Sequence, residues 1–125
     1  MKTTEQHQHS DQRRQRAIDR LDQQYRALAA QLATTGYVLQ GSIGKRWMTC
    51  GKIACRCTND PDFRHGPYFT WTFKRKAKTV CIYLSPDQAD LCAKWIKNNR
   101  NLERIVRQMR TISRRAAKLI DIPAK

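Results

Sequence analysis

The chain has 125 residues, and its 25 lysines and arginines against 10 aspartates and glutamates give a formal net charge of +15. A chain of this length forms one domain with a modest core and has no room for a large substrate pocket. It has no run of about 18 apolar residues, and its polar N-terminus lacks the apolar stretch of a signal peptide. The sequence therefore predicts a cytoplasmic protein that is not associated with a membrane.

The positive charge is concentrated in two parts of the chain. Residues 41–85 carry a net charge of +7 and residues 93–125 carry +8. A field of this size favours a polyanion, and nucleic acid is the commonest one in the cytoplasm. The alternative is a surface that is charged only for solubility, although such surfaces usually mix both signs. An anionic membrane is a weaker candidate because the chain lacks a bulky apolar face for insertion.

The N-terminal third of the chain has the periodicity of one amphipathic helix. We expect residues 1–9 to be a disordered tail and residues 10–36 to contain the helix, with Ser10 capping its start and Gly36 marking its end. Apolar residues recur at steps of three and four, which places them on one side of a helix. These residues are Ile18, Leu21, Tyr25, Leu28 and Leu32.

Residues 37–85 change to the alternating pattern of β-strands. In YFTWTFK and TVCIYLS, apolar side chains alternate with polar ones, and RKAK between them predicts a basic hairpin tip. This pattern predicts a small antiparallel sheet of two to three strands. One face of the sheet would carry the aromatic side chains, and the other would carry threonine, tyrosine and lysine.

The last segment predicts one long basic helix over residues 86–121. Ser85 supplies an N-cap, Pro86 occupies the first helical position, and Gln88 completes a capping box. Steps of four and three then continue over roughly four heptads. The fold class is therefore α+β, with helices on either side of the sheet in sequence. The apolar stripe consists of Leu91, Trp95, Asn98, Leu102, Ile105, Met109, Ile112, Ala116 and Leu119.

This stripe needs a partner along its length. Either the N-terminal helix folds back along it or a second copy of the chain covers it, and the apolar patch of Ile105, Met109 and Ile112 predicts a homo-oligomer. Asn98 within the stripe is either a polar contact that sets the register of the helices or a residue at a solvent-exposed gap.

Three cysteines and a histidine are spaced as C-x4-C-x-C-x7-H. Because cytoplasmic thiols stay reduced, metal binding or core packing is favoured over disulfides. Zn²⁺ takes four thiolate or imidazole ligands in a tetrahedron, which predicts a structural Cys3His zinc site in the β domain. Buried cysteines without metal and a reactive thiol are the alternatives. The candidate ligands are Cys50, Cys55, Cys57 and His65, with Cys81 and Cys92 as spectators.

The segments CGKIACRC and HGPYFTW, followed by KRKAKTVCIYLS, resemble an uncharacterised family of small bacterial proteins and domains. Members of that family share CGK-x-x-C-x-C and HGPY signatures. The resemblance covers roughly residues 41–112. It implies a mobile-element setting, because relatives are often found beside transposase or phage genes, but it implies no activity.

We expect no enzymatic activity, since no phosphate-binding loop or nucleophile motif occurs. The favoured function is binding of duplex DNA by an accessory protein of a mobile element. In this hypothesis threonines and a tyrosine on the sheet reach base edges, and cations hold phosphates. The predicted contacts are Lys45, Arg46, Thr70, Thr72, Lys74, Arg75, Lys76, Lys78 and Tyr83 on the sheet, with Arg100, Arg104, Arg107, Arg110, Arg114 and Lys118 on the C-terminal helix.

Two other functions remain open. The long helix could dock a transposase or recombinase, with the positive charge only keeping the protein near nucleic acid. RNA binding is the other alternative, because Tyr68, Phe69, Trp71 and Tyr83 could stack on bases, although the face of Phe69 and Trp71 is expected to be core.

Overall fold

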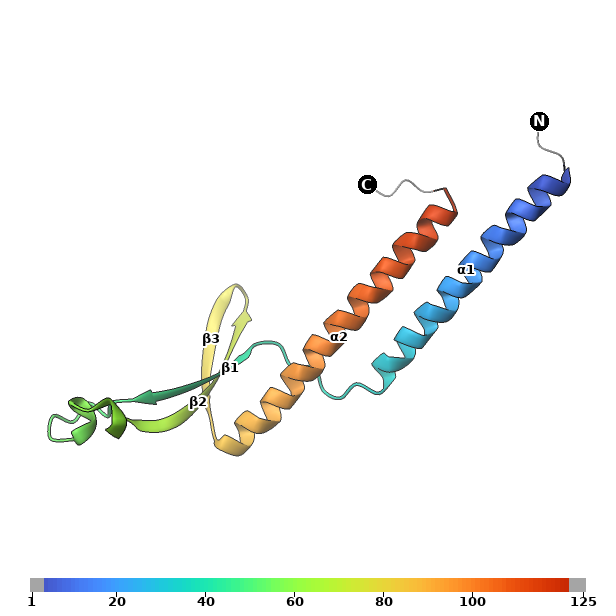
Figure 1. The fold of residues 1–125 in the computed structure, drawn as a ribbon. Coiled ribbons are helices and arrows are strands. Elements are labelled where there is room, and N and C mark those ends of the chain that lie inside the picture. Colours follow the sequence, from blue (N-terminus) through green and yellow to red (C-terminus); the bar gives the residue numbers. More distant parts are fainter. Residues whose placement is uncertain (1–3, 122–125) are drawn as a thin grey trace. The chain divides into compact units, whose positions relative to one another are not determined.

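The structure, a computed structural model, describes residues 4–121. Two helices flank a three-stranded antiparallel sheet in the sequence, and the strand order is β1-β2-β3 (Figure 1). The predicted α+β class is confirmed. The elements are α1 (Thr4–Ala33), β1 (Ser42–Met48), the short 3-10 helices η1 (Arg56–Thr58) and η2 (Pro61–Phe63), β2 (His65–Arg75), β3 (Lys78–Leu84) and α2 (Pro86–Leu119).

The described chain divides into two compact units, and α2 contributes to both. The helical unit contains α1 and the C-terminal part of α2, in residues 4–35 and 101–121. The sheet unit contains residues 36–100, with all three strands and the first turns of α2.

Helix α1 begins earlier than its sequence pattern predicts. The helix starts at Thr4, so residues 4–9 are helical and Ser10 lies inside the helix rather than at its N-cap. Residues 1–3 of the expected disordered tail lie outside the described residues. Polar helix formers such as Gln6 and Gln8 extend the helix without adding to its apolar stripe, which is why the periodicity alone starts it too late.

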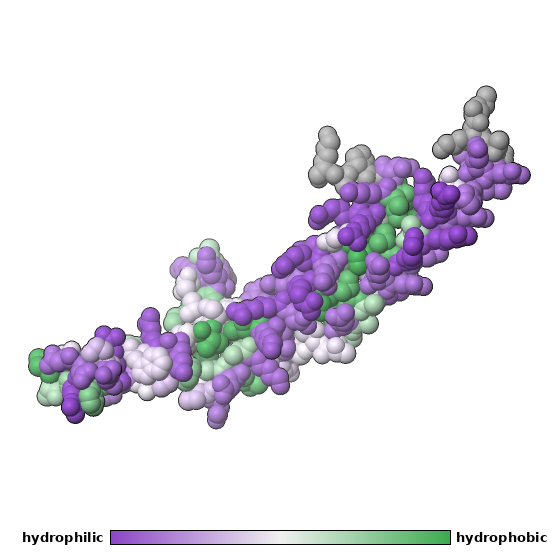
Figure 2. Space-filling model, viewed as in Figure 1, coloured by the Kyte–Doolittle hydropathy of each residue, from purple (hydrophilic) through white to green (hydrophobic). Residues whose placement is uncertain are grey.

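Within the helical unit, α1 lies antiparallel to the C-terminal part of α2 and packs against part of its apolar stripe. Arg14 near the start of α1 pairs with Asp121 after the end of α2, at 3.7 Å. Leu28 of α1 and Ile112 of α2 line the same shallow cavity, while Ile105 is fully buried. In Figure 2, apolar atoms gather along the seam between the two helices.

This pairing places α1 beside the part of the stripe that the sequence left to either of two partners. Of the patch residues, Ile105 and Ile112 are buried and Met109 is half-buried within one chain. The homo-oligomer stays a prediction.

In the sheet unit, side chains of the central strand β2 alternate between an aromatic face and a polar face of the sheet. Phe69, Trp71 and Phe73 pair with Leu84, Ile82 and Val80 of β3 across the aromatic face. The rings of Trp71 and Phe73 stack at 4.0 Å. The polar face carries Tyr68, Thr70, Thr72 and Lys74 of β2, with Tyr83, Cys81 and Thr79 of β3.

The tip of the β2–β3 hairpin places two ordinary residues in a strained conformation. Arg75 pairs with Lys78, so the connection has two residues, and Lys76 and Ala77 have φ of 50° and 64°. A two-residue hairpin connection with positive φ at both positions is a type I′ turn, which prefers asparagine and glycine.

We therefore expect Ala77→Gly to raise the free energy of unfolding by about 1 kcal/mol, because it relieves the left-handed conformation. Urea unfolding measures the change. The same substitution at the exposed helical residue Ala93 is the matched control and should lower the free energy of unfolding by about 1 kcal/mol. A loss of stability in Ala77→Gly would contradict the turn assignment.

The predicted start of α2 is confirmed. The backbone N–H of Ser85 donates to Gln88 Oε1 at 2.9 Å, and the Gln88 N–H donates to Ser85 Oγ at 3.2 Å, which is a complete capping box. Asn98 neither meets a partner helix nor faces an empty gap. Its Nδ2 donates to the carbonyl of Tyr37 at 3.0 Å and so fixes the segment before β1 against α2.

None of the helices in residues 4–121 combines the length and apolar character needed to cross a membrane.

Candidate metal centre

Cys50, Cys55, Cys57 and His65 lie together at one end of the sheet. Cys50 lies two residues after the end of β1. Cys55 is the residue just before η1, Cys57 lies within η1, and His65 is the first residue of β2. The antiparallel pairing of β1 and β2 brings Met48 opposite His65, which closes the loop that carries the cysteines.

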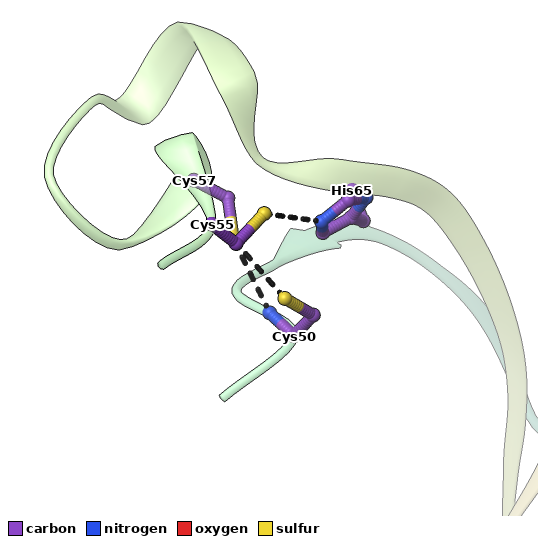
Figure 3. A group of neighbouring side chains, drawn as sticks. All are labelled: Cys50, Cys55, Cys57 and His65. Atoms are coloured by element: carbon purple, nitrogen blue, oxygen red, sulfur yellow. Dashed lines mark hydrogen bonds between the residues drawn. The ribbon is translucent and has the colours of Figure 1, made fainter. Parts of the chain in front are cut away.

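The four side chains converge on one point (Figure 3), and their ligand atoms all lie within 4.8 Å of one another. The Sγ atoms of Cys50 and Cys57 are 3.6 Å apart. Cys55 Sγ lies 3.2 Å from His65 Nε2. The predicted set of candidate ligands is therefore assembled in space by a loop that contains no regular strand.

These distances fit the edges of a metal-ligand tetrahedron. With metal–sulfur bonds of about 2.3 Å and metal–nitrogen bonds of about 2.0 Å, a tetrahedron has S···S edges of about 3.8 Å and S···N edges of about 3.5 Å. The Cys50–Cys57 and Cys55–His65 distances are each shorter than these edges by a few tenths of an ångström, whereas separations within the group extend to 4.8 Å. Side-chain shifts of up to about 1 Å, some inward and some outward, would bring the four ligands to a tetrahedron. The donor set is soft, which suits zinc and other thiolate-binding metals rather than magnesium or calcium.

Cys57 is the most enclosed of these residues and the best prepared to be a thiolate. Its side chain is 1% exposed, and it accepts a hydrogen bond from the Cys50 backbone N–H at 3.4 Å. That hydrogen bond is the largest cause that lowers the pKa of the Cys57 thiol to about 7, against the opposing effect of burial. A thiolate is the form of cysteine that binds metal ions.

Backbone contacts give the ligand loop its shape. The carbonyl of Lys52 accepts from the Cys55 N–H at 3.1 Å and from Thr58 Oγ1 at 2.8 Å. Gly66, next to His65, has a φ of +136°, and a Cβ there would lie 2.9 Å from the Arg46 carbonyl. The close approach of β1 and β2 beside the site thus requires a glycine at this position.

The two remaining cysteines lie apart from the cluster. Cys81 is exposed in β3, opposite Thr72, and Cys92 is half-buried in α2. Neither belongs to the group of converging ligand atoms, as the sequence predicted.

The residues predicted to contact nucleic acid on the sheet differ in their exposure. Thr70 is 7% exposed and lies between Gly44 and Tyr83 of the neighbouring strands. Its side chain is too deeply buried to reach a base edge in this conformation. Thr72 is half-buried, and the other predicted residues on the sheet, Lys45, Arg46, Lys74, Arg75, Lys76, Lys78 and Tyr83, are exposed.

The predicted cations of the C-terminal helix are all exposed on α2. Arg107 and Ile105 are two residues apart, as are Arg114 and Ile112, and residues two apart lie on nearly opposite sides of a helix. The cations therefore occupy the side of α2 that turns away from the covered stripe. Glu103 is the acidic residue on this side. We call Arg100, Arg104, Arg107, Arg110, Arg114 and Lys118 the α2 cationic face.

Sequence reasoning missed a set of aromatic residues around the ligand loop. Trp47 is 50% exposed and Phe63 is 43% exposed. The Lys45 Nζ lies 5.3 Å from the centroid of the Trp47 ring, and the Arg56 guanidinium lies 4.0 Å above the Phe63 ring. Arg56 and Phe63 lie on separate 3-10 helices, so the periodicity of a single helix or strand could not have revealed their contact.

Together, the fold and the cluster define a small α+β protein with a candidate Cys3His metal centre at the end of an antiparallel hairpin. The family model described as Domain of unknown function (DUF6788) matches residues 12–94, and the chain belongs to that family. The match runs from α1 into α2 and includes all four candidate ligands. No curated protein and no solved structure gives a significant match to the chain.

Proposed function

We propose that the protein binds nucleic acid, with duplex DNA as the favoured form, and that Cys50, Cys55, Cys57 and His65 hold a structural Zn²⁺. The proposed role is binding rather than catalysis. The α2 cationic face is the observation that carries it.

The α2 cationic face is exposed and is not used to cover the apolar stripe. Cations at steps of three and four along a straight helix can follow the regularly spaced phosphates of a duplex. Such contacts position a protein on DNA without reading its sequence. The cationic tip of the β2–β3 hairpin supplies a second group of exposed positive charges, which supports the same proposal.

Zinc in this proposal stabilises the ligand loop. The loop of residues 49–64 has only two short 3-10 helices and one buried cysteine side chain, Cys57, so little apolar burial is available to order it. A metal ion that joins both ends of the loop would replace the missing core. Three thiolates on Zn²⁺ leave a charge of −1, which Lys52, Arg56 and Arg64 of the same loop offset.

A titration of fluorescently labelled duplex at two salt concentrations tests the proposal. We expect binding that weakens steeply with salt. Arg75→Gln, Lys76→Gln and Lys78→Gln together should reduce the salt slope by roughly one unit for each phosphate that the variant no longer neutralises. Absence of binding at about 50 mM salt would overturn the proposal.

The second candidate is docking of a transposase or recombinase through α2; fewer apolar side chains are free for it where α1 lies beside α2, because Ile105 and Ile112 are buried there. A mobile-element setting rests on the family resemblance alone. It is compatible with DNA binding, since proteins of mobile elements act at DNA.

A further inference from the structure

The ligand-loop end of the sheet combines exposed rings with cations in a way that duplex binding does not use. Trp47 is 50% exposed and Phe63 is 43% exposed, so both rings present a large apolar area to solvent. In Figure 2 this end of the chain shows apolar atoms interspersed with hydrophilic ones. We call Trp47 and Phe63 the ring cluster.

Trp47 lies in β1 just before the ligand loop, and Phe63 lies within the loop. Trp47 lies at the irregularity between Arg46 and Met48, where β1 shifts register against β2. Phe63 belongs to η2, which is anchored by the Asp60 carboxylate accepting from the Asp62 N–H at 3.0 Å. Tyr68 pairs with Arg46, so its side chain lies on the opposite face of the sheet from Trp47 and is not part of the cluster. Each ring of the cluster is therefore attached to a backbone fixed by the sheet or a cap.

A cation lies against each of these two rings. The Lys45–Trp47 and Arg56–Phe63 contacts place a positive group on one ring face, and the residues between 45 and 68 include five cations and two acids. A protein partner that buried these rings would have to desolvate the cations as well, which is costly without matched acids. Unpaired nucleotides satisfy both groups, because their bases stack on rings and their phosphates pair with cations.

We infer that the ring cluster binds unpaired nucleotides of single-stranded DNA by base stacking. The choice of DNA over RNA rests on the proposed function, whereas the stacking chemistry rests on the rings and cations alone. In a duplex the bases are already stacked on one another, so this surface discriminates between paired and unpaired DNA. None of the six residues of the α2 cationic face is aromatic, so that face cannot distinguish paired from unpaired bases by stacking.

The test compares affinities of the zinc-loaded full chain for labelled oligothymidine of about 12 nucleotides and for a duplex. Trp47→Leu and Phe63→Leu keep an apolar side chain but remove the ring, and each should weaken single-strand affinity by about tenfold while changing duplex affinity by less than about twofold. Trp47→Phe keeps a ring and should retain affinity within about threefold. Ile53→Ala, at an exposed apolar residue of the same loop (92% exposed), is the matched control and should have no effect.

Tryptophan fluorescence supplies a second measurement that does not depend on a destabilising variant. Oligothymidine should quench the emission of the wild-type chain, and Trp47→Phe should remove that quenching, because Trp71 and Trp95 are half-buried. Unchanged affinity in both leucine variants, or an equal loss in Ile53→Ala, would overturn the inference. Tighter binding of oligouridine than of oligothymidine would overturn the assignment to DNA. If the single-strand results are as expected but the protein does not bind a duplex, the proposed function is wrong and the stacking surface is still supported.

Discussion

Cys57→Ser is expected to abolish stoichiometric metal binding and to unfold the ligand loop while leaving the helical unit intact. Cys57 is the buried member of the cluster, and its Sγ contacts both the N–H and the Sγ of Cys50. Structural zinc contributes on the order of 10 kcal/mol in small zinc domains, so loss of one thiolate removes most of the free energy that orders the loop. Elemental analysis of protein purified with zinc should give about one metal ion per chain for the wild type and almost none for this variant.

Hydrogen exchange then locates the damage. Amides of residues 50–65 should lose protection, whereas those of α1 and of α2 beyond residue 101 should keep theirs, since these belong to the other compact unit. Cys81→Ser is the control, because Cys81 is exposed and outside the cluster; it should keep both the metal and the protection. A wild-type chain that holds no metal when its loop is ordered would show that the cysteines are packing residues.

Periodicity predicted the regular elements well because each carries its own signal. The step of three and four along α2, the capping box at Ser85 and the alternation through β2 and β3 all report local backbone geometry. Periodicity starts α1 too late, because the polar helix formers in its first turns give no apolar repeat. The sequence could not predict the partner of α2, because α1 of the same chain and the helices of a second copy all carry an apolar stripe that could pair with it.

The candidate ligands could be identified from chemistry rather than from periodicity. Three cysteines and a histidine in one loop of a small sheet supply the four ligands that zinc requires, and the structure brings these four together. The burial of Thr70 and the exposure of Trp47 could not be predicted, because they depend on the tertiary packing around each side chain. Alternation assigns a residue to a face of a sheet, but it does not say how far that side chain reaches beyond its neighbours.

Replacing Arg107, Arg110 and Arg114 together with glutamine is expected to weaken duplex binding by about 10²- to 10³-fold at about 50 mM salt. Each cation that neutralises a phosphate contributes about 0.9 to the slope of log affinity against log salt, so the slope should fall by about 2.7. The three arginines are exposed and lie away from the stripe that α1 covers, so glutamine should preserve the helix. Fluorescence anisotropy with one duplex across a range of salt concentrations measures both quantities.

The matched control removes the same charge from another exposed basic group of the helical unit. Arg13, Arg16 and Arg20 lie on α1 near Asp19 and line one shallow surface depression. Because Asp19 offsets part of their charge, their replacement with glutamine should change the salt slope by less than one unit. If both triple variants weaken binding equally, net charge rather than the α2 cationic face governs the affinity. If only the α2 variant weakens binding, the α2 cationic face makes the phosphate contacts. Because phosphate contacts do not read sequence, any sequence preference then has to come from the sheet unit or from DNA shape.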